Sequence, residues 1–498
     1  MLPLSSILAA LPTNPHCTRG PAPQNVPIHS IAYDSRRVGP GSLFVAIPGL
    51  QTDGHRYLAA ACDAGAAACL VERPDEAPAR DDVTVVAVDN ARRALALASA
   101  AFHGWPGHHL TLVGVTGTNG KTTTTYLVEA MLTAAGRIPG LIGTIQVRIG
   151  GETREAKNTT PESLDLQQIL AEMVEKGHDS VAMEVSSHAL DLERVCGCRF
   201  AVGVFTNLTQ DHLDFHGDMA GYLAAKQRLF RELEASAAAV INTDDPHGAD
   251  MAAVTPARVI SYGIEGDAEV RATHVRHGDD GTRFHLSTPV GETDVTMRLA
   301  GRFNVYNALA AVGTALALGL PLDIITRTLA EIAPVRGRFE TVCEGQPFRV
   351  VVDYAHTPDG LENILQSARA ITEGRVLAVF GCGGDRDRTK RPRMGAIAQR
   401  LAHLAYVTSD NPRSEEPQAI IDDIVAGMDG PTPPVILADR RAAIEAALLA
   451  ARPGDCVVIA GKGHETYQII KNQTLHFDDA EVAREMLRHR AVGNGAEG

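Results

Sequence analysis

Short apolar runs rich in β-branched residues alternate with alanine- and leucine-rich stretches along nearly the whole chain, and this alternation limits the possible folds more than any other feature. It is typical of α/β folds with mainly parallel sheets. The length of 498 residues corresponds to about three domains at roughly 150 residues each. The sequence therefore predicts a three-domain α/β protein.

The pattern separates into three blocks. Residues 1–90 predict a small N-terminal α/β domain, residues 91–337 a central P-loop ATPase-like domain with a parallel sheet, and residues 338–498 a C-terminal Rossmann-like α/β domain. A more polar stretch near residues 265–298 predicts an antiparallel section within the central block. The carboxyl ends of parallel strands lie at the same edge of a sheet, so a ligand site is expected at that edge.

Composition excludes several classes of function. A net charge of −14 argues against a nucleic-acid groove. The eight cysteines form no C-x-x-C pair, so we interpret them as reduced thiols of a cytoplasmic enzyme. The N-terminus lacks a basic leader region, and no apolar run is long enough to cross a bilayer. We expect a cytoplasmic monomer with neither nucleic-acid nor membrane partners.

A glycine-rich segment between a predicted strand and a predicted helix is the strongest local signal. Its residues are Gly117, Thr118, Asn119, Gly120, Lys121, Thr122 and Thr123. Such a loop turns its backbone N–H groups toward a polyphosphate, its lysine reaches the terminal phosphates, and its hydroxyl suits Mg²⁺. The strict Walker pattern fails by one position, because Val115 stands where the first glycine belongs. A tight turn carrying a surface lysine is the alternative.

Polar residues end three neighbouring strands of the central block. Glu184, Asp211 and His212 are expected near the glycine loop, where a carboxylate could hold a magnesium ion that bridges phosphates. A single polar strand end is more often a cap or turn, but three that converge favour a metal–nucleotide site. Lys226 lies in a predicted helix, and its context alone indicates an ordinary solvated lysine.

The third block carries arginines and acids in loops that follow strands. The candidates are Arg386, Asp410, Asn411, Pro412, Arg413, Gly461 and Glu465. An arginine binds a carboxylate through two hydrogen bonds, and a carboxylate binds an ammonium group, so the set suits a zwitterion. Surface salt bridges are the alternative.

Several motifs together resemble the Mur ligase family of peptidoglycan synthesis over essentially the whole chain. They are Gly117–Thr123, Glu184–His188, Thr206–His212, Phe303–Asn307, Gly337–Glu340 and Asp353–His356. Within that family, Asn158–Pro161 and Asp410–Arg413 resemble the ligase that adds meso-diaminopimelate. The mismatch at Val115 is normal in this family.

The resemblance implies an ATP-dependent acid–amino-acid ligase that uses Mg²⁺. Its substrate would be the D-glutamate γ-carboxylate of UDP-N-acetylmuramoyl-L-alanyl-D-glutamate, activated as an acyl phosphate and joined to meso-diaminopimelate. Catalytic roles are implied for Lys121, Glu184, His212 and Lys226, with Asn307, Arg338 and His356 near ATP. Metal ligands would be Thr122, Glu184, His212 and Lys226, the last as a carbamate (N6-carboxylysine).

The resemblance also assigns substrate residues. The UDP-sugar and its peptide would contact Tyr33, Ser35, Leu50, Gln51, Thr52, Asn158, Thr159, Thr160, Ser186, Leu192 and Arg194. Leu192 departs from the glutamine frequent in relatives, which removes one hydrogen bond to the substrate. The seven residues of the third block would bind diaminopimelate.

Other functions remain open on the sequence alone. Another Mur-type or folylpolyglutamate-type ligase, or one that adds L-lysine, shares most of the motifs. A P-loop switch that binds proteins would explain Gly120–Thr122 but not the third-block loops. A dinucleotide-dependent dehydrogenase would need an intact G-x-G-x-x-G segment, which the chain lacks.

Overall fold

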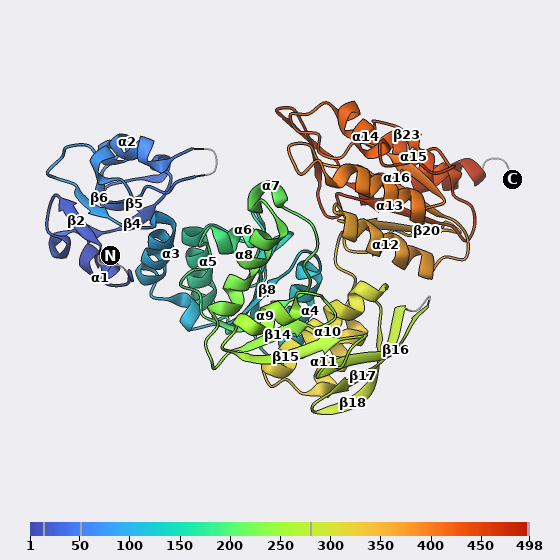
Figure 1. Cartoon of the computed structure of the whole chain (residues 1–498), viewed down its shortest axis with the longest axis horizontal. Coiled ribbons are helices and arrows are strands. Elements are labelled where there is room, and N and C mark those ends of the chain that lie inside the picture. Colours follow the sequence, from blue (N-terminus) through green and yellow to red (C-terminus); the bar gives the residue numbers. More distant parts are fainter. Residues whose placement is uncertain (13–14, 50–51, 279–280, 496–498) are drawn as a thin grey trace.

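The computed structural model describes residues 1–12, 15–49, 52–278 and 281–495, and it divides into three α/β units (Figure 1). The N-terminal and C-terminal units lie on opposite sides of the central unit in this view. The predicted three-domain α/β fold is confirmed.

The N-terminal unit is a five-stranded sheet in the order β2-β7-β6-β5-β4. Strands β4 to β7 pair in parallel, and β2 pairs antiparallel with β7. The bounds are β1 Leu2–Pro3, α1 Leu4–Leu8, β2 His16–Arg19, β3 Pro27–Ile28, β4 Ser30–Ala32, β5 Ser42–Val45, α2 Leu58–Asp63, β6 Ala66–Val71, β7 Thr84–Ala87 and α3 Ala91–Phe102.

Helix α3 joins the first two units. Its alanines and leucines pack in the core of the first sheet, and the helix also packs on α5 (Ser163–Glu175) of the central unit. Beyond it, Trp105 adopts a left-handed backbone with φ of 55° and stacks on His108 at 5.3 Å between ring centroids. This aromatic turn therefore lies at the junction of the two units.

The central unit contains an eleven-stranded sheet in the order β11-β10-β9-β12-β8-β13-β14-β15-β16-β17-β18. Its strands are β8 Thr111–Thr116, β9 Pro139–Ile142, β10 Gln146–Ile149, β11 Glu152–Glu155, β12 Ser180–Glu184, β13 Phe200–Phe205, β14 Ala238–Asn242, β15 Arg258–Gly263, β16 Val270–Gly278, β17 Gly281–Thr288 and β18 Gly291–Met297. The antiparallel pairing of β16, β17 and β18 confirms the antiparallel section predicted near residues 265–298.

The helices of the central unit cover its sheet. They are α4 Lys121–Ala134, α5, α6 Ser187–Asp191, α7 Leu213–His216, α8 Met219–Arg231, α9 Gly248–Val254, α10 Arg302–Ala317 and α11 Leu322–Glu331. Strand β8 pairs in parallel with β12 on one side and β13 on the other. The carboxyl ends of these three strands therefore meet at one edge, where α4 begins.

The C-terminal unit is a six-stranded sheet in the order β19-β20-β24-β21-β22-β23, parallel except for β19. Its elements are β19 Glu340–Thr341, β20 Arg349–Asp353, α12 Pro358–Ala370, β21 Val376–Phe380, α13 Lys390–Leu401, β22 Leu404–Val407, α14 Pro417–Val425, β23 Val435–Ile436, α15 Arg440–Ala450, β24 Cys456–Ala460, β25 Tyr467–Ile470, β26 Gln473–His476 and α16 Asp479–Gly495.

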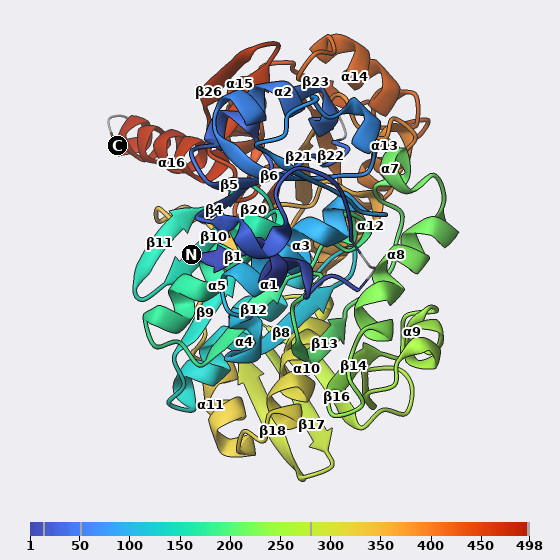
Figure 2. The same cartoon turned by 90° about the vertical axis from the view of Figure 1, so that its left-hand side faces the viewer.

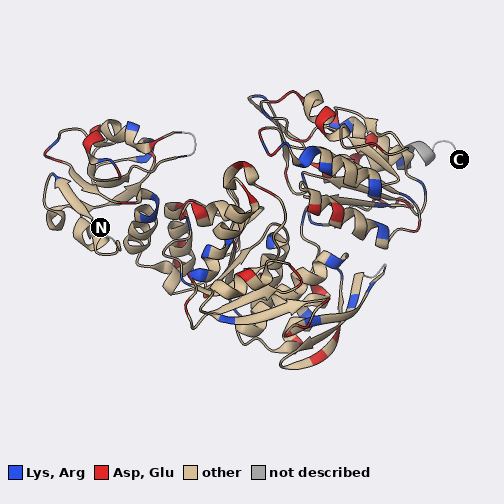
Figure 3. Cartoon of the chain, viewed as in Figure 1, with Lys and Arg blue, Asp and Glu red and all other residues tan. Residues whose placement is uncertain are grey.

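Both signs of charge are spread over all three units (Figure 3). Turned by 90°, the molecule shows the N-terminal unit in front of the C-terminal one (Figure 2). In the described part of the chain, no helix combines the length and apolar character needed to cross a bilayer.

Candidate functional site

The loop between β8 and α4 requires glycine at two positions. Gly117 has a φ of 149° and Gly120 a φ of 86°, a region that favours glycine. A Cβ added at Gly117 would lie 1.8 Å from Thr206 Oγ1, and one at Gly120 would lie 2.4 Å from Asn307 Oδ1. The loop can therefore keep its shape only without side chains at these positions.

The segment after β13 holds this loop in place. Asn207 accepts a hydrogen bond from Thr118 N through its backbone oxygen and from Asn119 N through Oδ1, both at 2.9 Å. Thr206 Oγ1 donates to Asn119 O at 2.6 Å. The motif that begins at Thr206 is therefore a scaffold for the glycine loop.

Lys121 begins helix α4 and folds back over the loop. Its Nζ donates to Gly117 O and Thr118 O, both at 2.9 Å. Burial lowers the pKa of this amine, while Glu184 acts in the opposite direction. A helix N-terminus and a cation on one loop form an anion site.

Oxygen atoms gather beside the loop around Glu184, which is 1% exposed. Thr122 Oγ1 donates to Glu184 Oε1 at 3.0 Å, and Thr144 donates to the same carboxylate from N at 2.8 Å and from Oγ1 at 3.1 Å. Among the described residues, no three His, Cys, Asp or Glu side chains already surround a common metal position. One hydroxyl and one carboxylate nevertheless fit Mg²⁺, which takes its other ligands from phosphates and water.

Lys226 is 1% exposed and lies over the ring of Tyr222, with Nζ 4.4 Å from the ring centroid. Burial lowers its pKa well below the ordinary value, and the charge of Lys121 lowers it further. Tyr222 OH also lies 3.2 Å from Thr118 Oγ1 of the glycine loop. The buried amine is therefore held close to the anion site in a form that favours loss of its proton.

His212 also lies close to Tyr222, at 6.2 Å between ring centroids and edge-on. Its Nε2 is 3.3 Å from Asp211 Oδ2, and its ring contacts that of His188 at 4.7 Å between centroids. Burial lowers the pKa of His212, so the imidazole is neutral at pH 7 and has a nitrogen lone pair available.

The C-terminal unit contacts the glycine loop directly. Arg338 Nη2 donates to Thr122 Oγ1 at 2.8 Å, and Asn119 Nδ2 donates to Asp359 Oδ2 at 2.7 Å. His356 Nε2 lies 3.8 Å from Asp211 Oδ2. Two units therefore meet at the predicted nucleotide site.

Arg386 and Arg413 lie on either side of a glycine turn in the C-terminal unit. A Cβ on Gly383 would lie 2.8 Å from Arg413 Nη1 and 3.9 Å from Arg386 Cγ. Arg413 also donates through Nη1 to Gly384 O at 2.8 Å. The Arg413 guanidinium group and the stem of the Arg386 side chain thus lie close to the same glycine.

The predicted acids and amide of this unit are also close together. Asn411 Nδ2 donates to Glu465 Oε2 at 2.8 Å, and a Cβ on Gly461 would lie 2.5 Å from Asp410 Oδ2. Pro412 continues the same loop. All seven third-block candidates therefore belong to three adjoining loops.

One candidate of the first unit, Tyr33, contacts the central unit. Tyr33 OH donates to Asp165 Oδ2 of α5 at 2.6 Å, and Thr52 Oγ1 lies 3.2 Å from Tyr57 OH. Ser35 begins a short 3-10 helix. Leu50 and Gln51 lie outside the described residues.

The remaining candidates connect to the Glu184 cluster. Thr160 Oγ1 donates to Glu184 O at 2.8 Å, Thr159 Oγ1 lies 3.0 Å from Thr144 Oγ1, and Ser186 N donates to Thr160 Oγ1 at 3.1 Å. Arg194 Nη1 donates to Thr160 O at 3.1 Å. Asn158 is exposed, and Leu192 is buried at the C-terminal end of α6.

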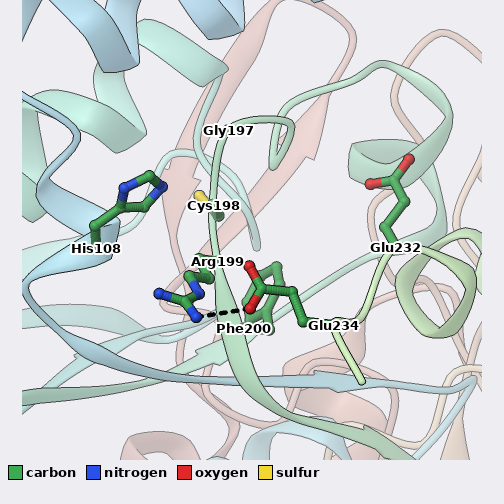
Figure 4. Close-up of a pocket in the computed structure, with 7 residues that line it drawn as sticks. All are labelled: His108, Gly197, Cys198, Arg199, Phe200, Glu232 and Glu234. Atoms are coloured by element: carbon green, nitrogen blue, oxygen red, sulfur yellow. Dashed lines mark hydrogen bonds and ion pairs between the residues drawn. The ribbon is translucent and has the colours of Figure 1, made fainter. Parts of the chain in front are cut away.

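Two cavities lie in other parts of the structure. The smaller, of about 170 Å³, is lined by His108, Gly197, Cys198, Arg199, Phe200, Glu232 and Glu234 (Figure 4). There Arg199 donates through Nη2 to Glu234 Oε2 at 2.7 Å. The larger, of about 620 Å³, lies between β16 and the β19–β20 region. No residue of the glycine loop lines either cavity.

Models of known families match all three units. Residues 27–103 match the Mur ligase family catalytic domain, residues 115–315 the Mur ligase middle domain, and residues 337–463 the Mur ligase glutamate ligase domain. The UDP-N-acetylmuramoyl-L-alanyl-D-glutamate--2,6-diaminopimelate ligase of Bacillus velezensis is 52% identical over 462 residues, covering 92% of this chain and 93% of its own. The chain belongs to the Mur ligase family. It is therefore an ATP-dependent amide ligase, as the motifs predicted.

Other Mur ligases agree with this assignment. The ligase of the same name from Gloeobacter violaceus is 49% identical over 467 residues, which cover 94% of this chain and 95% of its own. A solved structure of a UDP-N-acetylmuramoyl-L-alanyl-D-glutamate--2,6-diaminopimelate ligase is 31% identical, with a TM-score of 0.68 and coverage of 95% and 97%. The ADP complex of a MurF ligase from Thermotoga maritima, 20% identical with a TM-score of 0.66 and coverage of 94% and 99%, shares the fold.

Three residues of this Mur ligase site were missed in the sequence. Tyr222 links the loop to Lys226, Thr144 fixes Glu184, and Lys462, which is fully buried, lies 3.3 Å from Glu465. Only Lys462 had a signal, because it lies in a Gly-Lys-Gly segment directly after a strand. The other two depend on contacts between distant segments.

Proposed function

We propose that this chain joins meso-diaminopimelate to the D-glutamate γ-carboxylate of UDP-N-acetylmuramoyl-L-alanyl-D-glutamate, with conversion of ATP to ADP and phosphate, in peptidoglycan precursor synthesis. The observation that carries the proposal is the paired arginines around Gly383, in a chain about half identical over nearly its full length to ligases with this name. Two guanidinium groups can bind the second carboxylate, which diaminopimelate has and lysine lacks.

The reaction proceeds in two steps. A γ-carboxylate oxygen attacks the γ-phosphorus of ATP and ADP leaves, which gives an acyl phosphate. The diaminopimelate amine then attacks the acyl carbon, loses a proton, and expels phosphate as the amide forms. Lys121 and the backbone N–H groups of Gly117–Thr123 bind the phosphates, with Asn307, Arg338 and His356 beside the nucleotide.

Mg²⁺ would be held by Thr122 and Glu184, with a second ion near Glu184, His212 and Lys226. When bound, these ions neutralise the negative charge that gathers between the phosphates and the carboxylate. Lys226 serves this site as a carbamate, because its buried amine has a lowered pKa and a neutral amine reacts with CO₂. Carbamylation thus replaces a side chain that is ordinarily a cation with an anionic oxygen ligand.

The UDP-sugar and its peptide occupy the face between the first two units. Tyr33, Ser35 and Leu50–Thr52 receive the UDP-sugar, and Asn158, Thr159, Thr160, Ser186, Leu192 and Arg194 receive the peptide. Arg386, Asp410, Asn411, Pro412, Arg413, Gly461 and Glu465 receive diaminopimelate. In this proposal the UDP-sugar binds the first unit, its peptide the central unit and diaminopimelate the C-terminal unit, and the reacting groups meet at the glycine loop.

The mass of the product tests the proposal directly. Purified protein is incubated with the UDP-dipeptide, ATP, Mg²⁺ and either diaminopimelate or L-lysine, and the product is analysed by mass spectrometry. A diaminopimelate adduct supports the proposal. A lysine adduct alone, or an adduct only with D-alanyl-D-alanine or glutamate, would assign another specificity within the family.

We further propose that the enzyme is a cytoplasmic monomer without nucleic-acid or membrane partners. Its substrates are small anions made in the cytoplasm, and all the proposed site residues come from one chain. Light scattering coupled to size-exclusion chromatography tests this directly: a dimer mass at micromolar concentration would contradict it.

Arg413→Ala tests the amino-acid specificity. Lysine has no second carboxylate, so it leaves the partly buried guanidinium of Arg413 without that partner, which costs about 1–3 kcal/mol. We expect the ratio of kcat/KM for diaminopimelate to that for lysine to fall by roughly 10–100-fold in the variant. An unchanged ratio would remove Arg413 from the specificity site.

Gly117→Ala tests the shape of the glycine loop. The new Cβ would collide with Thr206 Oγ1, and residues forced into unfavourable backbone regions cost about 1–3 kcal/mol. We expect a distorted loop that binds ATP roughly 5–150-fold more weakly, measured by calorimetry, and a melting temperature lower by about a few degrees. Gly136→Ala is the matched control, because Gly136 also has a positive φ, of 80°, but no atom within 4 Å of the added Cβ.

A further inference from the structure

We propose that Arg391 and Glu415 are positioning residues that fix the spacing of Arg386 and Arg413 and thereby set the preference for an amino acid with a second carboxylate. This inference rests on the proposed function. Arg386 lies on the loop of residues 381–389, between β21 and α13, and Arg413 on the loop of residues 408–416, between β22 and α14. The two loops come from adjacent parallel strands, and their distance decides whether both guanidinium groups can bind one ligand.

An ion pair between a fully buried arginine and a partly exposed glutamate joins these loops. Arg391, at the start of α13, is 0% exposed and donates to both carboxylate oxygens of Glu415, at 2.9 Å through Nη1 and 2.7 Å through Nη2. It also donates to Gly383 O at 3.3 Å and to Asp423 Oδ2 at 2.9 Å. The planar fork therefore ties the glycine turn beside Arg386 to the loop that carries Arg413.

Glu415 extends the connection back to the first loop. Its Oε1 also accepts a hydrogen bond from Asp385 N at 2.6 Å. The hydrogen bonds from Arg391 lower the pKa of Glu415 to about 2, so the pair stays charged at neutral pH. Charge-assisted bidentate pairs are among the strongest and most directional contacts in proteins.

Further hydrogen bonds join the same two loops. Gly384 N donates to Asn411 O at 2.9 Å, and Asp385 accepts from Ser414 Oγ at 2.6 Å and from Ser414 N at 3.1 Å. Asp385 and Arg413 both have positive φ, 53° and 52°, which persists only where the surroundings fix it. Ser414 and Glu415 of the opposite loop thus hold Asp385, beside Arg386, while the backbone of Arg413 is held by Ile469 and Lys471 of the β25–β26 hairpin.

This arrangement predicts a specific kinetic effect. Arg386 is exposed and donates through Nη1 to the carbonyl oxygen of its neighbour Asp385, so its position depends on the loop rather than on packing. Loosening the loops moves the two guanidinium groups relative to each other. Diaminopimelate binding should suffer, because it needs both groups, whereas the proposed contacts of ATP and the UDP-substrate lie outside these two loops.

Glu415→Gln tests the proposal, with Glu362→Gln as the matched control. Glu362 also pairs with an arginine of the same unit, Arg400, at 2.9 Å, but in a solvent-exposed pair. We expect Glu415→Gln to raise KM for diaminopimelate by about tenfold or more and to lower the diaminopimelate-to-lysine preference. KM for ATP and for the UDP-dipeptide should stay within about twofold, and the control should match the wild type.

Ser414→Ala provides a second, milder test, since it removes one loop-to-loop hydrogen bond without leaving a buried charge. We expect about a threefold increase in KM for diaminopimelate alone. If Glu415→Gln fails to fold, the KM values of Ser414→Ala test the inference instead. An equal rise of all three KM values, a fall in kcat alone, or an unchanged preference in both variants would overturn the inference. A wild-type enzyme that does not use diaminopimelate would instead overturn the proposed function.

Discussion

Replacing Lys121 by alanine is expected to lower phosphate release from ATP by about 10²–10³-fold with all three substrates present. Its ammonium group lies at the N-terminus of α4, over the loop oxygens of Gly117 and Thr118. There it faces the phosphates whose charge grows in the transition state. Helix α4 contains no second lysine or arginine, and Arg338 of the C-terminal unit already donates to Thr122 Oγ1. Single-turnover measurement of ADP formation isolates the step.

Lys176→Ala is the control for this experiment. Lys176 is a partly exposed lysine of the same unit that pairs with Glu152 and Glu172, so its removal deletes the same charge away from the site. Its turnover should equal that of the wild type. If Lys121→Ala retained more than about a tenth of the wild-type rate, charge at this position would not assist phosphoryl transfer.

Lys226→Ala is expected to reduce turnover by about 10²–10³-fold, comparable to the loss of an electrostatic group in a water-poor site. The cause would be loss of the carbamate rather than of the amine. Added acetate, which returns a carboxylate to the vacated volume, is therefore expected to restore part of the activity. Ala252→Ser, a small change on α9 outside the site, serves as the control for expression and handling.

A direct observation of the carbamate accompanies that test. Incubation with ¹³C-labelled bicarbonate should give a carbamate carbon resonance in the wild type that is missing in Lys226→Ala. Lys226→Ala with wild-type turnover, or a resonance that persists in the variant, would assign the role elsewhere. Loss of activity without rescue by acetate would point to the amine itself.

The fold could be predicted from the sequence because strand ends and strand interiors follow simple rules. Buried parallel strands such as β8 and β21 are runs of branched apolar residues, and polar residues mark where they stop. The order of the strands in the sheet was beyond this reasoning. Two equally apolar strands can pair with either neighbour, and packing decides between them.

The site was predictable where one segment carries its own chemistry. Gly117–Lys121 indicated the glycine loop that the structure contains, while the role of Arg413 as partner of a substrate carboxylate stays a prediction. Lys226 had no such signal, because its burial arises from Tyr222 and the underlying sheet rather than from neighbours in sequence. For the same reason, the sequence gives Arg391 no special role, because its carboxylate partner lies 24 positions away and comes close only in the folded chain.

The aromatic turn at the junction of the first two units has a practical consequence. Trp105 is the single tryptophan of the 498 residues, and it stacks on His108 where α3 leaves the first unit. The tryptophan fluorescence of the protein, excited selectively at wavelengths where tyrosine does not absorb, therefore comes from one known position. A shift of that emission on addition of the UDP-dipeptide would report movement of the first unit, without any label and without interference from the C-terminal unit.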